Sequence, residues 1–347
     1  MKQVLVYGSG AIGGYLGSRL LHSGNDVVML DRPAMVDAIN EEGFRVDEGE
    51  QIIQVKPRAV SSLAEAYALN NTYDLFLLGL KSYDLPIALN DLAAHDTAGA
   101  TILTVQNGIG IEQPFIEAFG DGRILAGSLT TPVSKKGPFH LVIERSGRGL
   151  GLAPTKPGQD IAQWLSLFNE AGIETIGLVD YESMKWSKAF LNIVSNASSA
   201  ILDMTPGDVY RDAELFDLEV TMLRETMQVM GALDLEVINL PGSPARSLSL
   251  AIKYAPRLLL KPILTRLVAG GRGEKMPSFY IDLVSGRGKS EVIFHNGAIA
   301  DQGEEAGIQV KANRLLNDTL VKLTLGELSR ETFARNPQRL LAEMNKY

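Results

Sequence analysis

The chain has 347 residues, 45% of them apolar and 21% charged, which is ordinary globular usage and a length that predicts two domains. It contains no cysteine, which excludes disulfides, cysteine-ligated zinc and thiol catalysis. The formal net charge of −8 argues against nucleic acid as a partner, and no uncharged apolar run reaches the length of a membrane span, so we expect no membrane partner either.

The first predicted strand, residues 4–7, runs directly into a GxGxxG motif. An apolar helical pattern follows, and a second strand at residues 27–30 ends at Asp31, the spacing of a βαβ unit. Since the first strand begins beside Met1, we expect no signal peptide and a cytoplasmic location. The context predicts a dinucleotide-binding loop made of Gly8, Ser9, Gly10, Ala11, Ile12 and Gly13.

Each glycine of this motif has a physical role. Gly8 permits the tight turn, Gly10 lets the backbone approach a pyrophosphate, and Gly13 lets the helix pack closely on the strand. The start of the helix then offers free N–H groups and a partial positive charge to the phosphates. A ligand-free glycine-rich turn is the weaker alternative.

Three further apolar runs, at residues 73–80, 101–105 and 123–127, predict strands of a parallel sheet covered on both faces. Lys81 follows the first of these runs and Asn107 the second. Because parallel strands end at one edge of the sheet, we expect these side chains to line the same crevice as the glycine-rich loop. The predicted fold is α/β, a doubly wound Rossmann-type sheet, closed by a hairpin at residues 139–152.

The pattern becomes helical after about Gly177. We predict a Rossmann NAD(P)-binding domain at residues 1–178 and an all-helical substrate-binding domain, which also serves dimerisation, at residues 179–347. Residues 181–202 contain no Pro or Gly and predict one long helix. Lys188, Asn192 and Asn196 would then share one face, at positions i, i+4 and i+8, with a solvated helix face as the alternative interpretation.

At this point the chain resembles the ketopantoate reductase family, the 2-dehydropantoate 2-reductases, over nearly its full length. The resemblance rests on five blocks in the family's order: residues 8–14 (GSGAIGG), 80–84 (LKSYD), 106–110 (QNGIG), 185–192 with KWSK and Asn192, and 290–297 with SE and NG. It implies the NAD(P)H-dependent reduction of a 2-oxo acid to a 2-hydroxy acid, at a cleft between a Rossmann and a helical domain. The substrate implied first is 2-dehydropantoate, which becomes pantoate in pantothenate and coenzyme A biosynthesis.

The resemblance also implies roles for single residues. Lys188 matches the general acid that protonates the carbonyl oxygen, a task that suits an ammonium group, and Glu291 matches the carboxylate that orients substrate and lysine. Asn107 matches a residue that positions nicotinamide and substrate. Lys81 matches one near the cofactor phosphates or the substrate.

Asn192, Asn196 and Ser278 match substrate-binding positions, with Ser278 assigned to the substrate carboxylate. One departure from the family pattern lies close by: His295 precedes the NG pair at residues 296–297, where an apolar residue is common. Its place near Glu291 leaves a role toward the substrate open. The four histidines follow no metal-ligand spacing, so we predict no metal site.

Cofactor choice depends on the end of the second strand. Arg32 matches the family's arginine, which can bind the 2′-phosphate of NADP, whereas an acid such as Asp31 binds the ribose hydroxyls of NAD and repels that phosphate. If Asp31 points into the site we expect NAD, and if it caps the next helix we expect NADP. The sequence slightly favours NADP.

Two alternatives remain open for function. Beside the reduction of 2-dehydropantoate, they are a D-2-hydroxyacid dehydrogenase of the same family, acting on another branched or aromatic 2-oxo acid, and a non-catalytic NAD(P)H sensor. A small-molecule substrate is the expected partner, together with a second copy of the chain in a homodimer. The basic stretch at residues 253–272 is one candidate for that contact, and its two prolines predict breaks in the helix.

Overall fold

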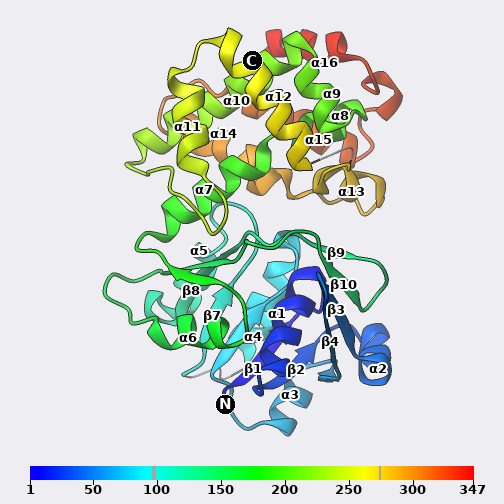
Figure 1. The fold of residues 1–347 in the computed structure, drawn as a ribbon, viewed down its shortest axis with the longest axis vertical. Coiled ribbons are helices and arrows are strands. Elements are labelled where there is room, and N and C mark those ends of the chain that lie inside the picture. Colours follow the sequence, from blue (N-terminus) through cyan, green and yellow to red (C-terminus); the bar gives the residue numbers. More distant parts are fainter. Residues whose placement is uncertain (96–98, 273–274) are drawn as a thin grey trace. The chain divides into compact units, whose positions relative to one another are not determined.

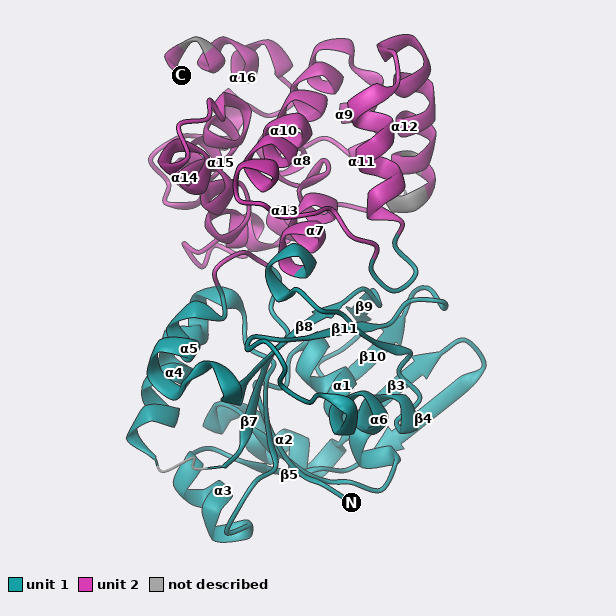
Figure 2. Cartoon of the chain, turned by 90° about the vertical axis from the view of Figure 1, so that its left-hand side faces the viewer, with its two compact units in different colours: residues 1–107, 111–184, 240–243 teal, residues 108–110, 185–239, 244–347 magenta. Residues whose placement is uncertain are grey.

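The computed structural model describes residues 1–95, 99–272 and 275–347, which form two compact units (Figures 1 and 2). The first unit holds residues 1–107, 111–184 and 240–243, and the second holds residues 108–110, 185–239 and 244–347. The first unit thus extends six residues past position 178, where we place the domain boundary. Residues 240–243 return to it because the Thr130 hydroxyl donates a 2.7 Å hydrogen bond to the Pro241 carbonyl.

An eight-stranded sheet forms the centre of the first unit, in the order β12-β11-β8-β7-β6-β1-β2-β5. The strands are β1 (Gln3–Tyr7), β2 (Asp26–Leu30), β5 (Arg58–Val60), β6 (Leu75–Leu78), β7 (Thr101–Thr104), β8 (Ile124–Leu129), β11 (Leu150–Pro154) and β12 (Thr175–Gly177). From β5 to β8 all neighbours are parallel, and only the β8–β11 pair is antiparallel. The order 5-2-1-6-7-8 is that of a doubly wound dinucleotide-binding sheet, which confirms the predicted fold.

Helix α1 lies between this sheet and a second, smaller one (Figure 1). A side chain at Gly17 would meet Val6 and Met29 of the large sheet, and one at Gly14 would meet Phe44 of the small sheet. The helical segments of this unit are α1 (Ala11–His22), α2 (Pro33–Glu42), α3 (Leu63–Leu69), η1 (Ser82–Asp84), α4 (Leu85–Ala94), α5 (Gln113–Phe119), η2 (Asp121–Arg123) and α6 (Ala162–Glu170).

The small sheet corrects the predicted hairpin at residues 139–152. It has the order β4-β3-β10-β9 and is formed by β3 (Phe44–Glu48), β4 (Gln51–Val55), β9 (Val133–Lys135) and β10 (His140–Ile143). Strand β10 pairs with β3 and β9, whereas β11 pairs with β8 and β12 in the large sheet. The hairpin prediction is wrong because the two strands find their partners in different sheets.

The second unit is helical, as predicted (Figure 2), and it buries one continuous apolar core. Its helical segments are α7 (Tyr181–Ile193, which starts in the first unit), α8 (Asn196–Leu202), α9 (Pro206–Arg211), α10 (Ala213–Ala232), α11 (Ala245–Tyr254), α12 (Arg257–Arg272), α13 (Ser278–Val284), η3 (Glu291–Phe294), α14 (Asn296–Glu305), α15 (Lys311–Thr324), η4 (Arg330–Thr332), α16 (Pro337–Glu343) and η5 (Met344–Lys346). Among the described residues, none of the helices is both long and apolar enough to span a bilayer.

Two sequence expectations about these helices are wrong. The predicted long helix at residues 181–202 is broken at Ser195, which has φ +55 and separates α7 from α8. Pro262, in contrast, does not break α12, which continues through it, and only Pro256 lies in the gap between α11 and α12. Pro262 is the sixth residue of α12, beyond the first turn, so the helix continues there without the bond that an N–H would donate to the Leu258 carbonyl.

Candidate active site

The glycine-rich loop of the first unit is packed against the end of β6. Gly8 has φ +95, and a side chain there would lie 2.9 Å from the Leu80 nitrogen. A Cβ at Gly13 would overlap the Gly8 carbonyl oxygen, and one at Gly79 would lie 2.7 Å from the Gly13 Cα atom. Three backbone segments therefore meet where only glycine fits, beside the β1–β6 border at which a doubly wound sheet changes direction.

Gly10 is different, since its own surroundings do not exclude a side chain. The nearest atom to an added Cβ is the Gly79 carbonyl oxygen at 3.7 Å, an ordinary contact. Gly10 is also the N-cap of α1, and neither a capping side chain nor an acid occupies the first turn of that helix. An open glycine at an uncapped helix N-terminus fits a pyrophosphate, so the residues present suit a dinucleotide.

Asp31 is turned toward this loop. Its Oδ2 atom accepts a 2.8 Å bond from the Ser9 backbone N–H and a short one from the Ser9 hydroxyl, and its Oδ1 atom accepts a 2.7 Å bond from the Arg32 N–H. The N-cap of α2 is Arg32, and no side chain caps that helix. Asp31 therefore does not cap α2. Its side chain is 14% exposed, against 82% for that of Arg32.

A second cation lies within electrostatic reach of this carboxylate. Burial lowers the pKa of Lys135 on β9, and the negative charge of Asp31 opposes that lowering. The end of β2 thus combines one fixed carboxylate with two cationic side chains, Arg32 and Lys135, from different elements. This is the part of the first unit that bears on cofactor choice.

Lys81 and Asn107, predicted from strand ends, belong to neighbouring segments after β6 and β7. The Ser82 hydroxyl donates a 2.8 Å bond to the Asn107 carbonyl, which joins the two segments. Gln106 adds bonds of 2.6 Å and 3.1 Å from its amide to the carbonyls of Leu78 and Leu80. Their positions at this edge of the sheet follow from the topology, while their roles toward a ligand stay predictions.

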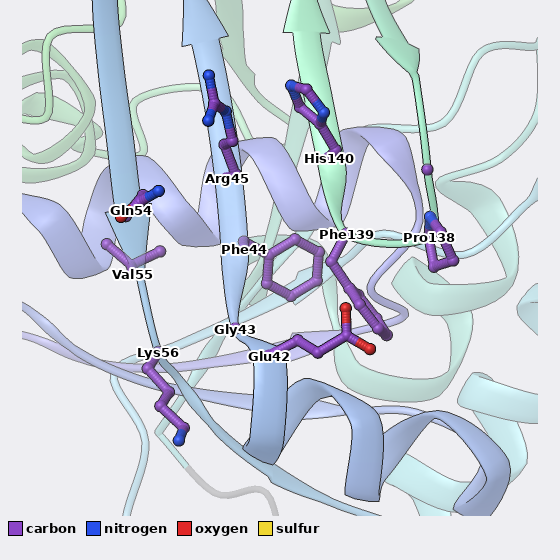
Figure 3. A pocket seen from close by; sticks show the side chains of 11 residues that line it. Glu42, Gly43, Phe44, Arg45, Gln54, Val55, Lys56, Pro138, Phe139 and His140 are labelled. Carbon is purple, nitrogen blue, oxygen red and sulfur yellow. The ribbon is translucent and has the colours of Figure 1, made fainter.

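The first unit also has a surface hollow of about 430 Å³ on the small sheet (Figure 3). Phe44 and Phe139 meet edge to face beside it, with ring centroids 5.4 Å apart, and Arg45 and His140 lie at its rim. Arg45 and His140 both bond Asp47, and the Arg45 guanidinium, followed by His140, lowers the pKa of that carboxyl. None of the predicted site residues lines this hollow.

In the second unit, Lys188 and Asn192 lie one turn apart on α7, both partly buried. Asn196 does not continue their stripe, because the chain turns at Ser195. Glu219 of α10 is fully buried and holds this turn: it accepts a 2.8 Å bond from the Ser195 N–H and a 2.6 Å bond from the Ser198 hydroxyl. The helix can break here because the buried carboxylate of Glu219 bonds the Ser195 N–H, which the break would otherwise leave without a partner.

The break directs Asn196 to the start of α13. Its Oδ1 atom accepts a 3.1 Å bond from the Phe279 N–H, and its Nδ2 atom donates bonds of 3.3 Å to the Ser278 hydroxyl and 3.2 Å to the Asn192 carbonyl. Asn196 and Ser278, both predicted to bind substrate, are thus brought together. Asn196 is only 4% exposed, so much of its bonding capacity serves the protein itself.

Glu291 begins η3 and is 6% exposed. Its backbone carbonyl lies 3.1 Å from His295 Nδ1, and His295 Nε2 lies 3.5 Å from Asn192 Nδ2. The His295 ring also packs edge to face on Phe279, with centroids 5.3 Å apart. One network therefore joins α7, α8, α13 and η3, whereas the predicted approach of the Lys188 and Glu291 side chains stays a prediction.

Sequence reasoning missed two residues of these arrangements. The sequence pattern places Gly79 only inside an apolar strand. A glycine inside such a run, however, indicates a close backbone approach, here to Gly8 and Gly13. Glu219 lies on the apolar side of α10, and a carboxylate there is the signal of a buried polar contact.

Each of the two units is matched by a model of a known protein family. A family model described as Ketopantoate reductase PanE/ApbA matches residues 4–149, and one described as Ketopantoate reductase PanE/ApbA C terminal matches residues 180–323. The chain belongs to the ketopantoate reductase family. It is an enzyme, an NAD(P)-dependent oxidoreductase of the class that acts on CH–OH groups.

Known ketopantoate reductases are similar to this chain over nearly its whole length. The 2-dehydropantoate 2-reductase of Pyrococcus horikoshii is 28% identical over 320 residues, which are 90% of this chain and 95% of that protein. A crystal structure of a PanE/ApbA family ketopantoate reductase from Ralstonia eutropha JMP134 has a TM-score of 0.77 at 26% identity, covering 93% of this chain and 98% of that one. D-mandelate dehydrogenase with NADH and anilino(oxo)acetate shares the fold, with a TM-score of 0.76 at 20% identity, covering 92% and 98% of the two chains.

Proposed function

We propose that this protein reduces 2-dehydropantoate to pantoate, with hydride from a nicotinamide cofactor. The observation that carries the proposal is the match of both family models, one to the dinucleotide-binding half and one to the helical half of the chain. The hydrogen-bonded group of Asn192, Asn196, Ser278 and His295 supports it, because a 2-oxo acid with a hydroxyl group needs several polar partners.

In this proposal the cofactor supplies the hydride, and the chain supplies position and the proton. Lys188 donates a proton to the carbonyl oxygen of the substrate as negative charge develops there. Glu291 orients Lys188, Asn107 orients the reacting groups, and the Ser278 hydroxyl donates a hydrogen bond to the substrate carboxylate. Lys81 lies toward the cofactor phosphates.

Replacing Lys188 tests this chemistry. We expect Lys188→Ala to lower kcat at least about a hundredfold, the usual contribution of a general acid, with an unchanged Kd for the cofactor. Lys253→Ala, an exposed lysine on α11, is the control and should keep full activity. The assay is oxidation of reduced cofactor with 2-dehydropantoate, pyruvate, 2-oxoisovalerate and benzoylformate. Turnover with none of them beside intact cofactor binding would favour the sensor, and full activity of Lys188→Ala would refute the mechanism.

For the cofactor we propose NADH over NADPH. Asp31 is held at the glycine-rich loop by two hydrogen bonds from Ser9, accepts a third from the Arg32 N–H, and does not cap α2. This is the arrangement for which sequence reasoning expects NAD. A carboxylate at the end of the second strand favours the ribose hydroxyls and repels a 2′-phosphate. Arg32 and Lys135 soften that repulsion, so the preference is expected to be moderate.

Binding titrations of NADH and NADPH test this choice without turnover. We expect the wild type to bind NADH about tenfold more tightly, and Asp31→Asn to bring the two Kd values together by removing the charge that repels the phosphate. Arg32→Ala is the matched control and should weaken only NADPH. An NADPH preference in the wild type that Asp31→Asn leaves unchanged would contradict the proposal.

We also propose that a second copy of the chain covers the exposed apolar face of α11 and α12. This face carries exposed Leu250, Tyr254, Leu258, Leu259, Ile263 and Leu267. Residues 259, 263 and 267 form one stripe along α12, and a two-fold axis would set this stripe against its copy in the second chain. Light scattering should find a dimer for the wild type and for the control Ile87→Glu, and a monomer for Ile263→Glu. A monomeric wild type would overturn this.

A further inference from the structure

His295 is a buried imidazole in a position that the proposed chemistry does not use. It is 1% exposed and forms the N-cap of α14, with φ −120 and ψ −94. An apolar residue here would fill the space without hydrogen bonds. An imidazole kept inside a helical core needs polar partners for its nitrogens, and the structure provides one on each side.

These partners indicate which nitrogen of the neutral ring carries the hydrogen. Nδ1 faces the Glu291 backbone carbonyl at 3.1 Å, and a carbonyl oxygen only accepts, so Nδ1 carries the hydrogen. In the neutral ring Nε2 is then an acceptor, and it faces Asn192 Nδ2 at 3.5 Å, which donates. The contact orients the Asn192 amide, because a flipped amide would set its oxygen against the Nε2 lone pair.

The ring itself is held in place by α13. Phe279 packs against it edge to face, and the Phe279 backbone N–H is bonded to Asn196 Oδ1. Asn196 in turn donates to the Asn192 carbonyl. The Asn192 side chain is therefore oriented by the ring and its backbone is tied to the same network, which makes the orientation of the amide a property of the folded core.

We propose that His295 is a positioning residue that selects 2-oxo acids bearing a hydroxyl group. With Nδ2 directed to His295, the opposite edge of the Asn192 amide presents Oδ1, an acceptor suited to a substrate hydroxyl. 2-Dehydropantoate has such a hydroxyl, and 2-oxoisovalerate, a branched 2-oxo acid of similar shape at the reacting end, does not. This inference rests on the proposed function in one respect, the assignment of Asn192 to the substrate.

The first test reads the ring directly. Long-range proton–nitrogen NMR of protein labelled with 15N-histidine distinguishes the two neutral tautomers, and the signal of His295 among the four histidines is the one that His295→Gln removes. We expect the Nδ1–H tautomer at neutral pH. An Nε2–H tautomer or a charged ring would overturn the pairing with Asn192, whatever the enzyme reduces.

The second test separates positioning from simple packing. We expect His295→Leu to raise KM for 2-dehydropantoate about tenfold, the effect of one lost hydrogen bond, with kcat within about twofold and with KM for 2-oxoisovalerate and Kd for NADH unchanged. His295→Gln, whose amide oxygen can accept from Asn192, should restore KM to within about threefold. An equal rise of KM for both substrates, or no rescue by glutamine, would overturn the proposal. Failure of the wild type to reduce any 2-oxo acid would overturn the proposed function, while the NMR result would still decide the pairing.

Discussion

The two units build their candidate sites from different material. In the first unit the site is backbone: the glycine-rich loop, the start of α1 and the end of β6 lie so close that a Cβ at Gly13 does not fit. In the second unit it is a network of side chains from distant segments, with Asn192 and His295 separated by 103 positions and Asn196 and Ser278 by 82. In the first site a single added methyl group should strongly impair cofactor binding. In the second site, the loss of one hydrogen bond should impair substrate binding only in part.

The largest effect on cofactor binding is expected at the backbone site. Gly13→Ala should lower the free energy of unfolding by about 1–3 kcal/mol, because the new methyl group overlaps the Gly8 carbonyl. It should also weaken NADH binding by about a hundredfold, the loss of two charged hydrogen bonds to phosphate. Chemical denaturation and NADH fluorescence titration measure the two effects.

Gly10→Ala is the matched variant, since its methyl group would meet only the Gly79 carbonyl at 3.7 Å. We expect nearly wild-type stability together with impaired NADH binding. Normal NADH binding by Gly10→Ala would show that the pyrophosphate does not approach this residue.

The next effect concerns the turn between α7 and α8. Glu219→Leu leaves the Ser195 N–H and the Ser198 hydroxyl buried without their carboxylate, at a cost of about 3 kcal/mol in the free energy of unfolding. Since the turn sets Asn196 relative to Asn192, KM for the substrate should also rise, while Kd for NADH should not.

Glu219→Gln separates charge from hydrogen bonding, because its oxygen can still accept from Ser195 and its amide can donate to the Ser198 hydroxyl. We expect a loss of about 1 kcal/mol or less. If glutamine and leucine were equally damaging, the charge of Glu219, rather than its bonds to the turn, would be the stabilising feature.

The smallest effect is expected at the contact between α8 and α13. Ser278→Ala removes the bond from Asn196 but leaves the one that Asn196 accepts from the Phe279 N–H. Ser278 is exposed, so stability should change by no more than about 0.5 kcal/mol, while KM should rise severalfold if Ser278 binds the substrate carboxylate. Steady-state kinetics and thermal unfolding of the same preparation give both numbers, and an unchanged KM would remove Ser278 from the site.

Local sequence was sufficient for the first βαβ unit of the dinucleotide half. The GxGxxG motif, the apolar strands and Asp31 at the end of β2 all act within one βαβ unit, where spacing along the chain determines spacing in space. The same local rules predicted the helical character of the second unit. They could not place strands whose partners lie elsewhere, which is why the predicted hairpin of β10 and β11 is wrong.

Only the tertiary structure decided the remaining features. Residues 181–202 have the composition of one helix, and the break at Ser195 exists because Glu219, 24 positions away, accepts its N–H. The sequence leaves the direction of the Asp31 side chain open, and its bonds to Ser9 show that direction. His295 is an isolated histidine in the sequence, and the fold brings it to Asn192 and to the Glu291 carbonyl. A buried polar group must find a hydrogen-bonding partner, but which partner it finds depends on the packing of the whole unit and not on its neighbours in the chain.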